Sequence, residues 1–257
     1  MTNQKKPALE PKTQAFLEAV NSSGGKPLYE LSYADARNVL ENAQSSAQVT
    51  KLPADLEDHT LPVGPTGEVP VTIYKPANSS GLLPVVMYFH GGGWILGSKR
   101  THDRLVRDLV NATKAAFVFV NYTPSPEAQF PIPNEQSYAA TQYIAENGKQ
   151  FGLDSSRLAI AGDSVGGNMT AVVSLLAKER KGPEIRYQVM FNPVTDSCLS
   201  QPTYEEFENG PWLSKATMSW MWDAYAPNKE DRKKHTAAPL QASLDQLDEN
   251  DILREEG

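Results

Sequence analysis

A serine between two glycines is the feature of this sequence that most directly indicates chemistry. Ser164 lies in Gly162-Asp-Ser-Val-Gly-Gly167, after the short apolar run Leu158 to Ala161 and before the apolar helical pattern Met169 to Leu176. The pattern Gly-x-Ser-x-Gly between a strand and a helix forms a turn so tight that the serine hydroxyl projects beyond the end of the sheet. Ser164 is therefore the candidate nucleophile.

Three consecutive glycines upstream supply a second element of the same chemistry. The run Leu83 to Phe89 predicts a buried strand, and His90-Gly-Gly-Gly-Trp94 follows it directly. Glycines leave backbone N–H groups uncovered by side chains, as the stabilisation of an oxyanion requires. A plain flexible loop would contain the same glycines, but two strand-terminal motifs in this order favour catalysis. We therefore predict that Gly91, Gly92 and Gly93 contribute to an oxyanion hole.

Together the two motifs resemble the hormone-sensitive-lipase-like branch of the α/β-hydrolases, a family of serine carboxylesterases and lipases. The resemblance implies a mostly parallel central sheet flanked by helices, with a helical cap. It also implies that the amide of Val165, the residue after the nucleophile, joins Gly92 and Gly93 as an oxyanion donor. Thr123 stands where the family usually has arginine. Further matches cover most of the chain from about Asp55 onward, at Asn121 to Pro131, Phe191 to Pro193, Gly210 to Leu213 and Ala238 to Leu240.

The acid and the base of a catalytic triad are less well defined. A serine hydroxyl is a poor nucleophile near neutral pH, so it needs a base and a carboxylate that orients the base. Asn250 to Gly257 resembles the family segment whose first aspartate belongs to the triad, which makes Asp251 the candidate acid. No histidine follows Asp251, although the family order is Ser, Asp, His. Compared with the family, the sequence lacks an internal strand and the closing helix, strand and histidine loop.

Four histidines precede Asp251. His90 belongs to the glycine motif, and we expect its ring to brace that loop. We interpret His59 and His102 as scaffold or surface residues. His235 follows a charged run and is a poor candidate, because a base must come within hydrogen-bond reach of Ser164.

Several explanations of the missing base remain open: a longer esterase of which this sequence is a part, a truncation, a histidine from a second chain, or a pocket that binds without hydrolysing. We favour the first, a serine carboxylesterase acting on small acyl esters. The alternative is a non-hydrolytic small-molecule binding protein on the same scaffold, as the resemblance to plant gibberellin receptors allows. A third hypothesis is a degenerate fragment without function.

The elements that must position these residues follow an α/β pattern. Strands alternating with helices predict right-handed crossovers and active-site groups at the carboxyl ends of the strands. We predict an N-terminal helical cap region at 1–52 and a catalytic α/β-hydrolase domain at 53–257, with a cap insertion at about 195–226. The aromatic residues of this insertion fit half of a lid or ordinary helix core equally well. Strands are predicted at Leu56 to Val63, Val69 to Tyr74, Pro84 to Phe89, Ala116 to Tyr122, Leu158 to Ala161 and Tyr187 to Phe191, and helices at Thr13 to Val20, Ser32 to Leu40, Thr101 to Thr113, Asn134 to Asn147 and Asn168 to Lys181.

Composition limits the remaining possibilities. The net charge of −7 argues against nucleic acid and anionic membrane surfaces as partners. The single cysteine, Cys198, forms no intrachain disulfide, and Met1 to Glu10 lacks a basic and apolar leader, so we expect a cytoplasmic protein. No cluster has the spacing of metal ligands, and neither a metal nor an organic cofactor is implied. A homodimer remains an open prediction, because family dimers often pair through the late strands.

Overall fold

The computed structural model describes residues 9–22, 24–46, 49–210, 212–243 and 245–246. The predicted acid, Asp251, lies outside these residues. In the described chain the strands are β1 (Ala54–Leu61), β2 (Val69–Pro76), β3 (Leu83–Phe89), β4 (Ala116–Val120), β5 (Leu153–Asp163) and β6 (Tyr187–Phe191). The helices are α1 (Pro11–Ser22), α2 (Tyr33–Ser46), α3 (Lys99–Thr113), α4 (Ile132–Asn147), α5 (Val165–Glu179), α6 (Pro202–Glu206) and α7 (Lys215–Tyr225), with short 3-10 turns that include η1 (Leu28–Glu30).

The six strands form one sheet in the order β1-β2-β4-β3-β5-β6. Strands β4, β3, β5 and β6 are parallel, whereas β1 and β2 pair antiparallel at one side. The mostly parallel sheet and its flanking helices confirm the prediction. Because the parallel strands run in one direction, their carboxyl ends meet at one edge, where β3 and β5 deliver the two glycine motifs.

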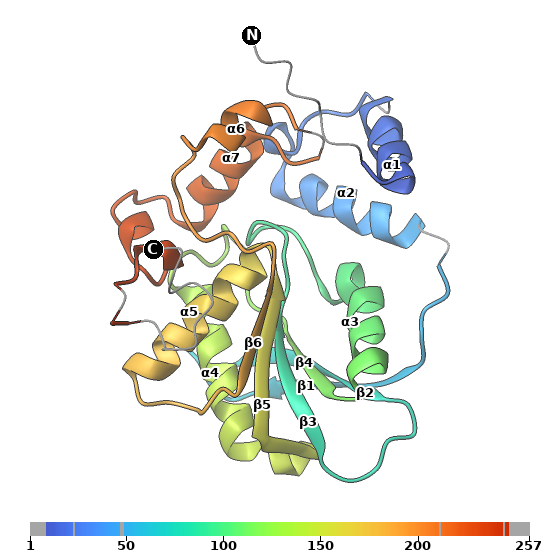
Figure 1. The fold of residues 1–257 in the computed structure, drawn as a ribbon, viewed down its shortest axis with the longest axis vertical. Coiled ribbons are helices and arrows are strands. Elements are labelled where there is room, and N and C mark those ends of the chain that lie inside the picture. The colour runs from blue at the N-terminus through green and yellow to red at the C-terminus, as the bar shows by residue number, and fades with distance from the viewer. Residues whose placement is uncertain (1–8, 23, 47–48, 211, 244, 247–257) are drawn as a thin grey trace.

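Successive side chains of a strand point to opposite faces of the sheet, so the core has two parts, one on each face. Val85, Met87 and Phe89 of β3 belong to the cluster that also contains the buried face of α5, while Tyr88 packs with Val106 of α3. Figure 1 shows α3 on one side of the sheet and α4 and α5 on the other. Each face of the sheet is thus covered, as near-continuous apolar strands require.

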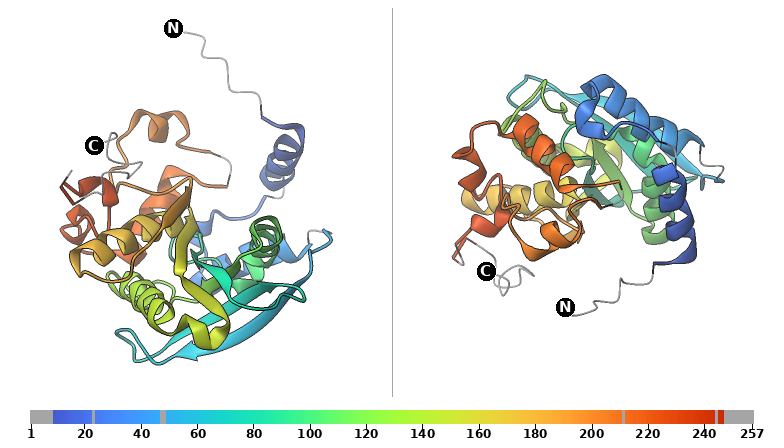
Figure 2. Two further views of the ribbon diagram at one scale, coloured as in Figure 1. Left: turned by 60° about the horizontal axis from the view of Figure 1, so that its bottom comes forward. Right: turned by 90° about the horizontal axis from the view of Figure 1, so that it is seen from above.

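Helices α1, α2, α6 and α7 lie together above the carboxyl edge of the parallel strands (Figures 1 and 2). A stacked pair joins the N-terminal helices to the 195–226 insertion: Tyr33 of α2 and Trp220 of α7, whose ring centroids are 5.3 Å apart. The predicted N-terminal helical region and the aromatic insertion therefore meet over the same end of the sheet. None of the helices in the described part of the chain has the length and apolar character needed to cross a membrane.

Strand β6 forms one edge of the sheet within the described residues. Tyr187 is 68% exposed and Phe191 is 41% exposed, although both belong to an apolar strand. By contrast, every residue of β4, in the interior of the sheet, is buried. The edge strand thus exposes aromatic surface at Phe191, whose backbone carbonyl accepts a hydrogen bond from the Ser164 amide.

Candidate active site

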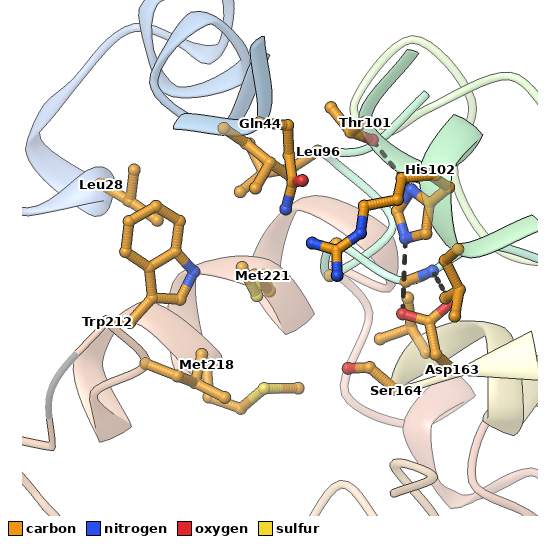
Figure 3. A pocket seen from close by; sticks show the side chains of 18 of the residues that line it. Leu28, Gln44, Leu96, Thr101, His102, Asp163, Ser164, Trp212, Met218 and Met221 are labelled. Carbon is orange, nitrogen blue, oxygen red and sulfur yellow. Dashed lines mark hydrogen bonds and ion pairs between the residues drawn. The ribbon is translucent and has the colours of Figure 1, made fainter. Parts of the chain in front are cut away.

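Ser164 occupies the turn between β5 and α5. The strand ends at Asp163 and the helix begins at Val165, so Ser164 is the single residue between them. Its backbone has φ 54° and ψ −118°, a conformation that costs a non-glycine residue on the order of 1–3 kcal/mol. Figure 3 shows the serine hydroxyl directed into a cavity. The predicted tight turn between a strand and a helix is therefore present, and its strain lies at Ser164.

The surrounding backbone holds this strained turn in place. The Ser164 amide donates a hydrogen bond to the Phe191 carbonyl at the end of β6, at 2.8 Å. A Cβ atom at Gly166 would overlap the Phe89 carbonyl, and one at Gly162 would overlap the Gly166 carbonyl. Both glycines are therefore required by close approach of the backbone, and the motif is a packing constraint as well as a chemical signature.

The glycine loop after β3 is equally crowded. Gly92 and Gly93 have φ of 117° and 65°, which side chains rarely adopt. A Cβ atom at Gly92 would overlap the Leu96 carbonyl, and one at Gly93 would overlap the Met221 side chain of α7. The loop is thus a fixed turn pressed against its neighbours, which argues against the alternative of a plain flexible loop.

Three amides at this site lack an intramolecular acceptor. Among the described residues, the N–H groups of Gly92, Gly93 and Val165 have no hydrogen-bond partner, although Gly93 and Val165 are buried. Buried backbone amides are normally paired. All three residues line the same cavity as Ser164. Unpaired amides beside a strained serine are what a developing oxyanion would bind.

The Gly91 amide is engaged elsewhere. It donates to Asp163 Oδ1 at 3.0 Å, and the Tyr88 hydroxyl donates to the same oxygen at 2.7 Å. The predicted set of oxyanion donors, Gly91 to Gly93 with Val165, is therefore narrowed to the other three. The contact instead ties the glycine loop to the residue that precedes the nucleophile, so that the two halves of the site share one carboxylate.

His102 reaches the same carboxylate from α3. Its Nε2 lies 3.5 Å from Asp163 Oδ2, and its Nδ1 lies 2.8 Å from the Thr101 hydroxyl oxygen. Burial favours the neutral form of Asp163, but the contacts with His102, Tyr88 and Gly91 outweigh it and hold the pKa of this carboxyl below its ordinary value. Figure 3 shows His102 and Asp163 together beside Ser164. The expectation that His102 belongs to the scaffold or surface missed its position in the cavity wall.

His90 braces the glycine loop, as its place in the motif predicted. Its buried ring stacks on Tyr122 at 4.3 Å and on Phe119 at 5.2 Å between centroids. Nδ1 lies 2.9 Å from the Gly91 carbonyl, so a hydrogen on Nδ1 donates to it. Desolvation, with the nearby charge of His102, lowers the pKa of His90 to about 3. His90 is thus a neutral structural residue.

The other two histidines lie away from the nucleophile. His235 pairs with Glu179 at 2.6 Å, and Glu179 is the last residue of the helix that begins after Ser164. A helix rises about 1.5 Å per residue, which separates the two ends of α5 by roughly 20 Å. His59 lies on β1 beside Glu57. Within the described chain, therefore, neither is placed to take a proton from Ser164.

The cavity at Ser164 has a volume of about 500 Å³, within the usual range for small-molecule sites. Figure 3 shows Leu28, Trp212, Met218 and Met221 on the side away from His102. These apolar residues come from η1, from α7 and from the segment before α7, all above the end of the sheet. The elbow thus supplies the floor of the cavity and the helices above it supply the walls.

Arg37 fixes α2 to the core beside this cavity. Its guanidinium donates to both carboxylate oxygens of Glu127 at 2.8 and 2.6 Å, and to the carbonyls of Ile95 and Ser125 at 2.9 Å each. Ile95 follows the glycine loop closely in sequence. Sequence reasoning did not identify Arg37, because its four acceptors lie 58 to 90 residues away.

Comparisons with known proteins agree with this geometry. The sequence profile of a family described as alpha/beta hydrolase fold matches residues 86–257. A putative alpha/beta hydrolase of Acanthamoeba polyphaga mimivirus is 35% identical over 259 residues, covering 97% of this chain and 73% of that protein. The carboxylesterase NlhH of Mycobacterium tuberculosis is 34% identical over 240 residues, covering 86% of this chain and 75% of that protein.

A solved structure is similar over nearly all of the chain. It is that of a thermostable esterase from Pseudomonas putida, 45% identical, with a TM-score of 0.92. The similarity covers 98% of this chain and 82% of that one.

Proposed function

Because this chain belongs to the hormone-sensitive-lipase-like carboxylesterases of the α/β-hydrolase superfamily, we propose that it hydrolyses small acyl esters through an acyl-enzyme on Ser164. One observation carries the proposal. The strained serine and the three amides without acceptors, those of Gly92, Gly93 and Val165, line a single cavity. The esterase and carboxylesterase names of its relatives support the same reaction.

In the proposed reaction Ser164 Oγ attacks the ester carbonyl carbon. The carbonyl oxygen becomes an oxyanion that accepts hydrogen bonds from the three amides, and collapse of the tetrahedral intermediate expels the alcohol. Water then attacks the acyl-enzyme carbonyl and releases the carboxylic acid. Asp163 and the Gly91 amide act earlier, by holding the serine and the glycine loop in register before substrate arrives.

The base of this reaction has to be a histidine oriented by Asp251, and that assignment remains a prediction. Among the described residues, no histidine makes a hydrogen bond to Ser164, and His102 Nε2 faces Asp163. We therefore do not assign His102 as the base. We propose that helices α1, α2, α6 and α7 act as a cap, since they lie together above the elbow and residues of α2 and α7 wall the cavity.

Hydrolysis of p-nitrophenyl butyrate tests the proposal. We expect turnover that Ser164→Ala abolishes, a loss of up to about six orders of magnitude where the triad is complete. Where no histidine serves Ser164, added imidazole should raise the rate of the parent chain and leave that of Ser164→Ala at the level of free imidazole. Tight binding of ester analogues without hydrolysis, with or without imidazole, would instead support the non-hydrolytic binding protein.

A further inference from the structure

We propose that the catalytic cavity continues, past a wall made by Leu28 and Trp212, into a second chamber that receives a long apolar arm of the ester. This inference rests on the proposed function and specifies its substrate class, esters with an extended alkyl or aryl arm. The second chamber is a cavity of about 920 Å³. Its apolar lining includes Leu28, Tyr29, Leu31, Val39, Leu199 and Trp212.

The two cavities share part of their lining. Leu28 and Trp212 belong to both, whereas Ser164 lines only the catalytic cavity. Figure 3 shows the two shared side chains at the end of the catalytic cavity farthest from His102, with Met218 and Met221 between them and Ser164. An acyl or alcohol arm that leaves the reacting carbon along the methionines therefore meets this wall and, behind it, the second chamber.

The backbone of Trp212 is strained. Its φ is 70°, a backbone conformation that is an outlier for a bulky residue. Its ring contacts Phe16 of α1, with 6.0 Å between centroids. Strain of this kind persists where surrounding structure imposes it, and it is concentrated at ligand sites. Here it directs the largest side chain of the segment to the boundary between the two chambers.

The chemistry of the lining selects the occupant. The charged residues of the second chamber are Lys26, Glu208 and Lys215, whose long side chains can keep their charges in water. The lining also includes four uncharged polar side chains, and the apolar residues named above are the part of it that an alkyl or aryl arm would contact; the polar ones are Asn209, Ser214, Thr217 and Ser219. The volume of the chamber is within the range of small-molecule sites, which fits one hydrocarbon arm and not a folded partner.

Filling the second chamber provides the first test. Ala216 is an exposed residue of α7 that lines the second chamber and not the catalytic cavity, so Ala216→Trp adds bulk away from Ser164. We expect kcat/KM for p-nitrophenyl decanoate to fall at least tenfold, with p-nitrophenyl acetate unchanged. Ala112→Trp, at an exposed position of α3 outside both linings, is the matched control and should change neither.

Opening the wall provides the second test. Trp212→Ala should raise the ratio of decanoate to acetate hydrolysis, because it widens the passage between the two chambers. Equal changes on both esters in Trp212→Ala and Ala216→Trp would overturn the proposal.

A binding measurement separates this inference from the proposed function. In the Ser164→Ala background, calorimetry should show that decanoate binds more tightly than butanoate, by about fourfold for each methylene group buried. Ala216→Trp should remove this dependence. Chain-length-dependent binding without any ester hydrolysis would retain the chamber and reject the esterase. Hydrolysis with decanoate affinity insensitive to Ala216→Trp would reject the chamber and retain the esterase.

Discussion

Helix α5, which begins at the nucleophile, and helix α2, which lies above the cavity, are held to the protein in different ways. Twelve of the 15 residues of α5 are buried, whereas in α2, with 14 residues, the one buried residue is Ala36. Tight backbone packing at Gly162 and Gly166 fixes the start of α5. Side-chain contacts from Arg37, together with the pair of Glu41 and Arg100, hold α2 to the core.

This difference in packing suggests that the residues near Ser164 and the residues that shape the cavity above it respond differently to mutation. The elbow depends on backbone approaches that admit no side chain, whereas the glycine loop also packs against the Met221 side chain and donates a hydrogen bond to the Asp163 carboxylate. The walls of the cavity depend on a few long side chains and on apolar residues that are partly exposed, such as Leu213 at 46%. We therefore expect changes in the elbow to affect folding and catalysis together, and changes above it to affect substrate choice.

The largest expected effect is at Gly166. Gly166→Ala places a Cβ atom against the Phe89 carbonyl, and we expect a loss of more than about 3 kcal/mol in the free energy of unfolding. Gly25→Ala is the matched control, because Gly25, like Gly166, lacks a positive φ but has open space around it, and it should change the free energy of unfolding by less than about 1 kcal/mol. Urea unfolding measures both. Equal losses would show that packing at the elbow is not the constraint.

A smaller and more local effect is expected at Arg37. Arg37→Ala leaves α2 without its bonds to Glu127, Ile95 and Ser125, and should lower the local stability of α2 by about 2 kcal/mol, giving roughly thirtyfold faster amide exchange there. Exchange in α5 should remain unchanged. Arg157→Ala breaks an exposed pair with Asp154 and should leave exchange in both helices as it is. Equal acceleration in α2 and α5 would contradict the comparison.

The effect of protonation at His90 is absent at neutral pH and grows as the pH falls. The pKa of His90 is lowered to about 3 by desolvation, whereas an unfolded histidine titrates near 6.5, so the unfolded chain binds this proton first. Stability should therefore fall as pH drops below about 6.5, by about 1.4 kcal/mol per pH unit from this residue. His90→Gln should be less stable at pH 7 but show a correspondingly shallower pH dependence in urea unfolding. Parallel profiles for the two proteins would reject a neutral, buried His90.

Sequence patterns were sufficient to predict the turn at Ser164 and most of the strands and helices. The predicted strand Tyr187 to Phe191 matches β6 to the residue, and the predicted helix Thr101 to Thr113 begins two residues after α3 does. Local periodicity and glycine spacing encode these features. The predicted strand Leu158 to Ala161 is extended in β5 to Leu153–Asp163, because Leu153 and Asp154 also pair with β3, before an irregularity in the register, and Asp163 pairs with β6.

Contacts between distant residues were not predictable in this way. The sequence indicates only that His102 is a scaffold or surface residue, and the packing of α3 on the sheet is what brings it to Asp163. The residues alone did not distinguish Gly91 from Gly92 and Gly93, which the family resemblance favoured as donors, and the fold gives the Gly91 amide an acceptor in Asp163.

The central claim is that the Ser164 hydroxyl and the amides of Gly92, Gly93 and Val165 converge on one reacting carbon. A crystal structure of the protein after treatment with an alkyl phosphonate ester tests it directly. We expect a covalent bond from Ser164 Oγ to phosphorus, with one phosphoryl oxygen within about 3 Å of all three amide nitrogens. A phosphonate bound to Ser164 with that oxygen turned away from these amides would contradict it.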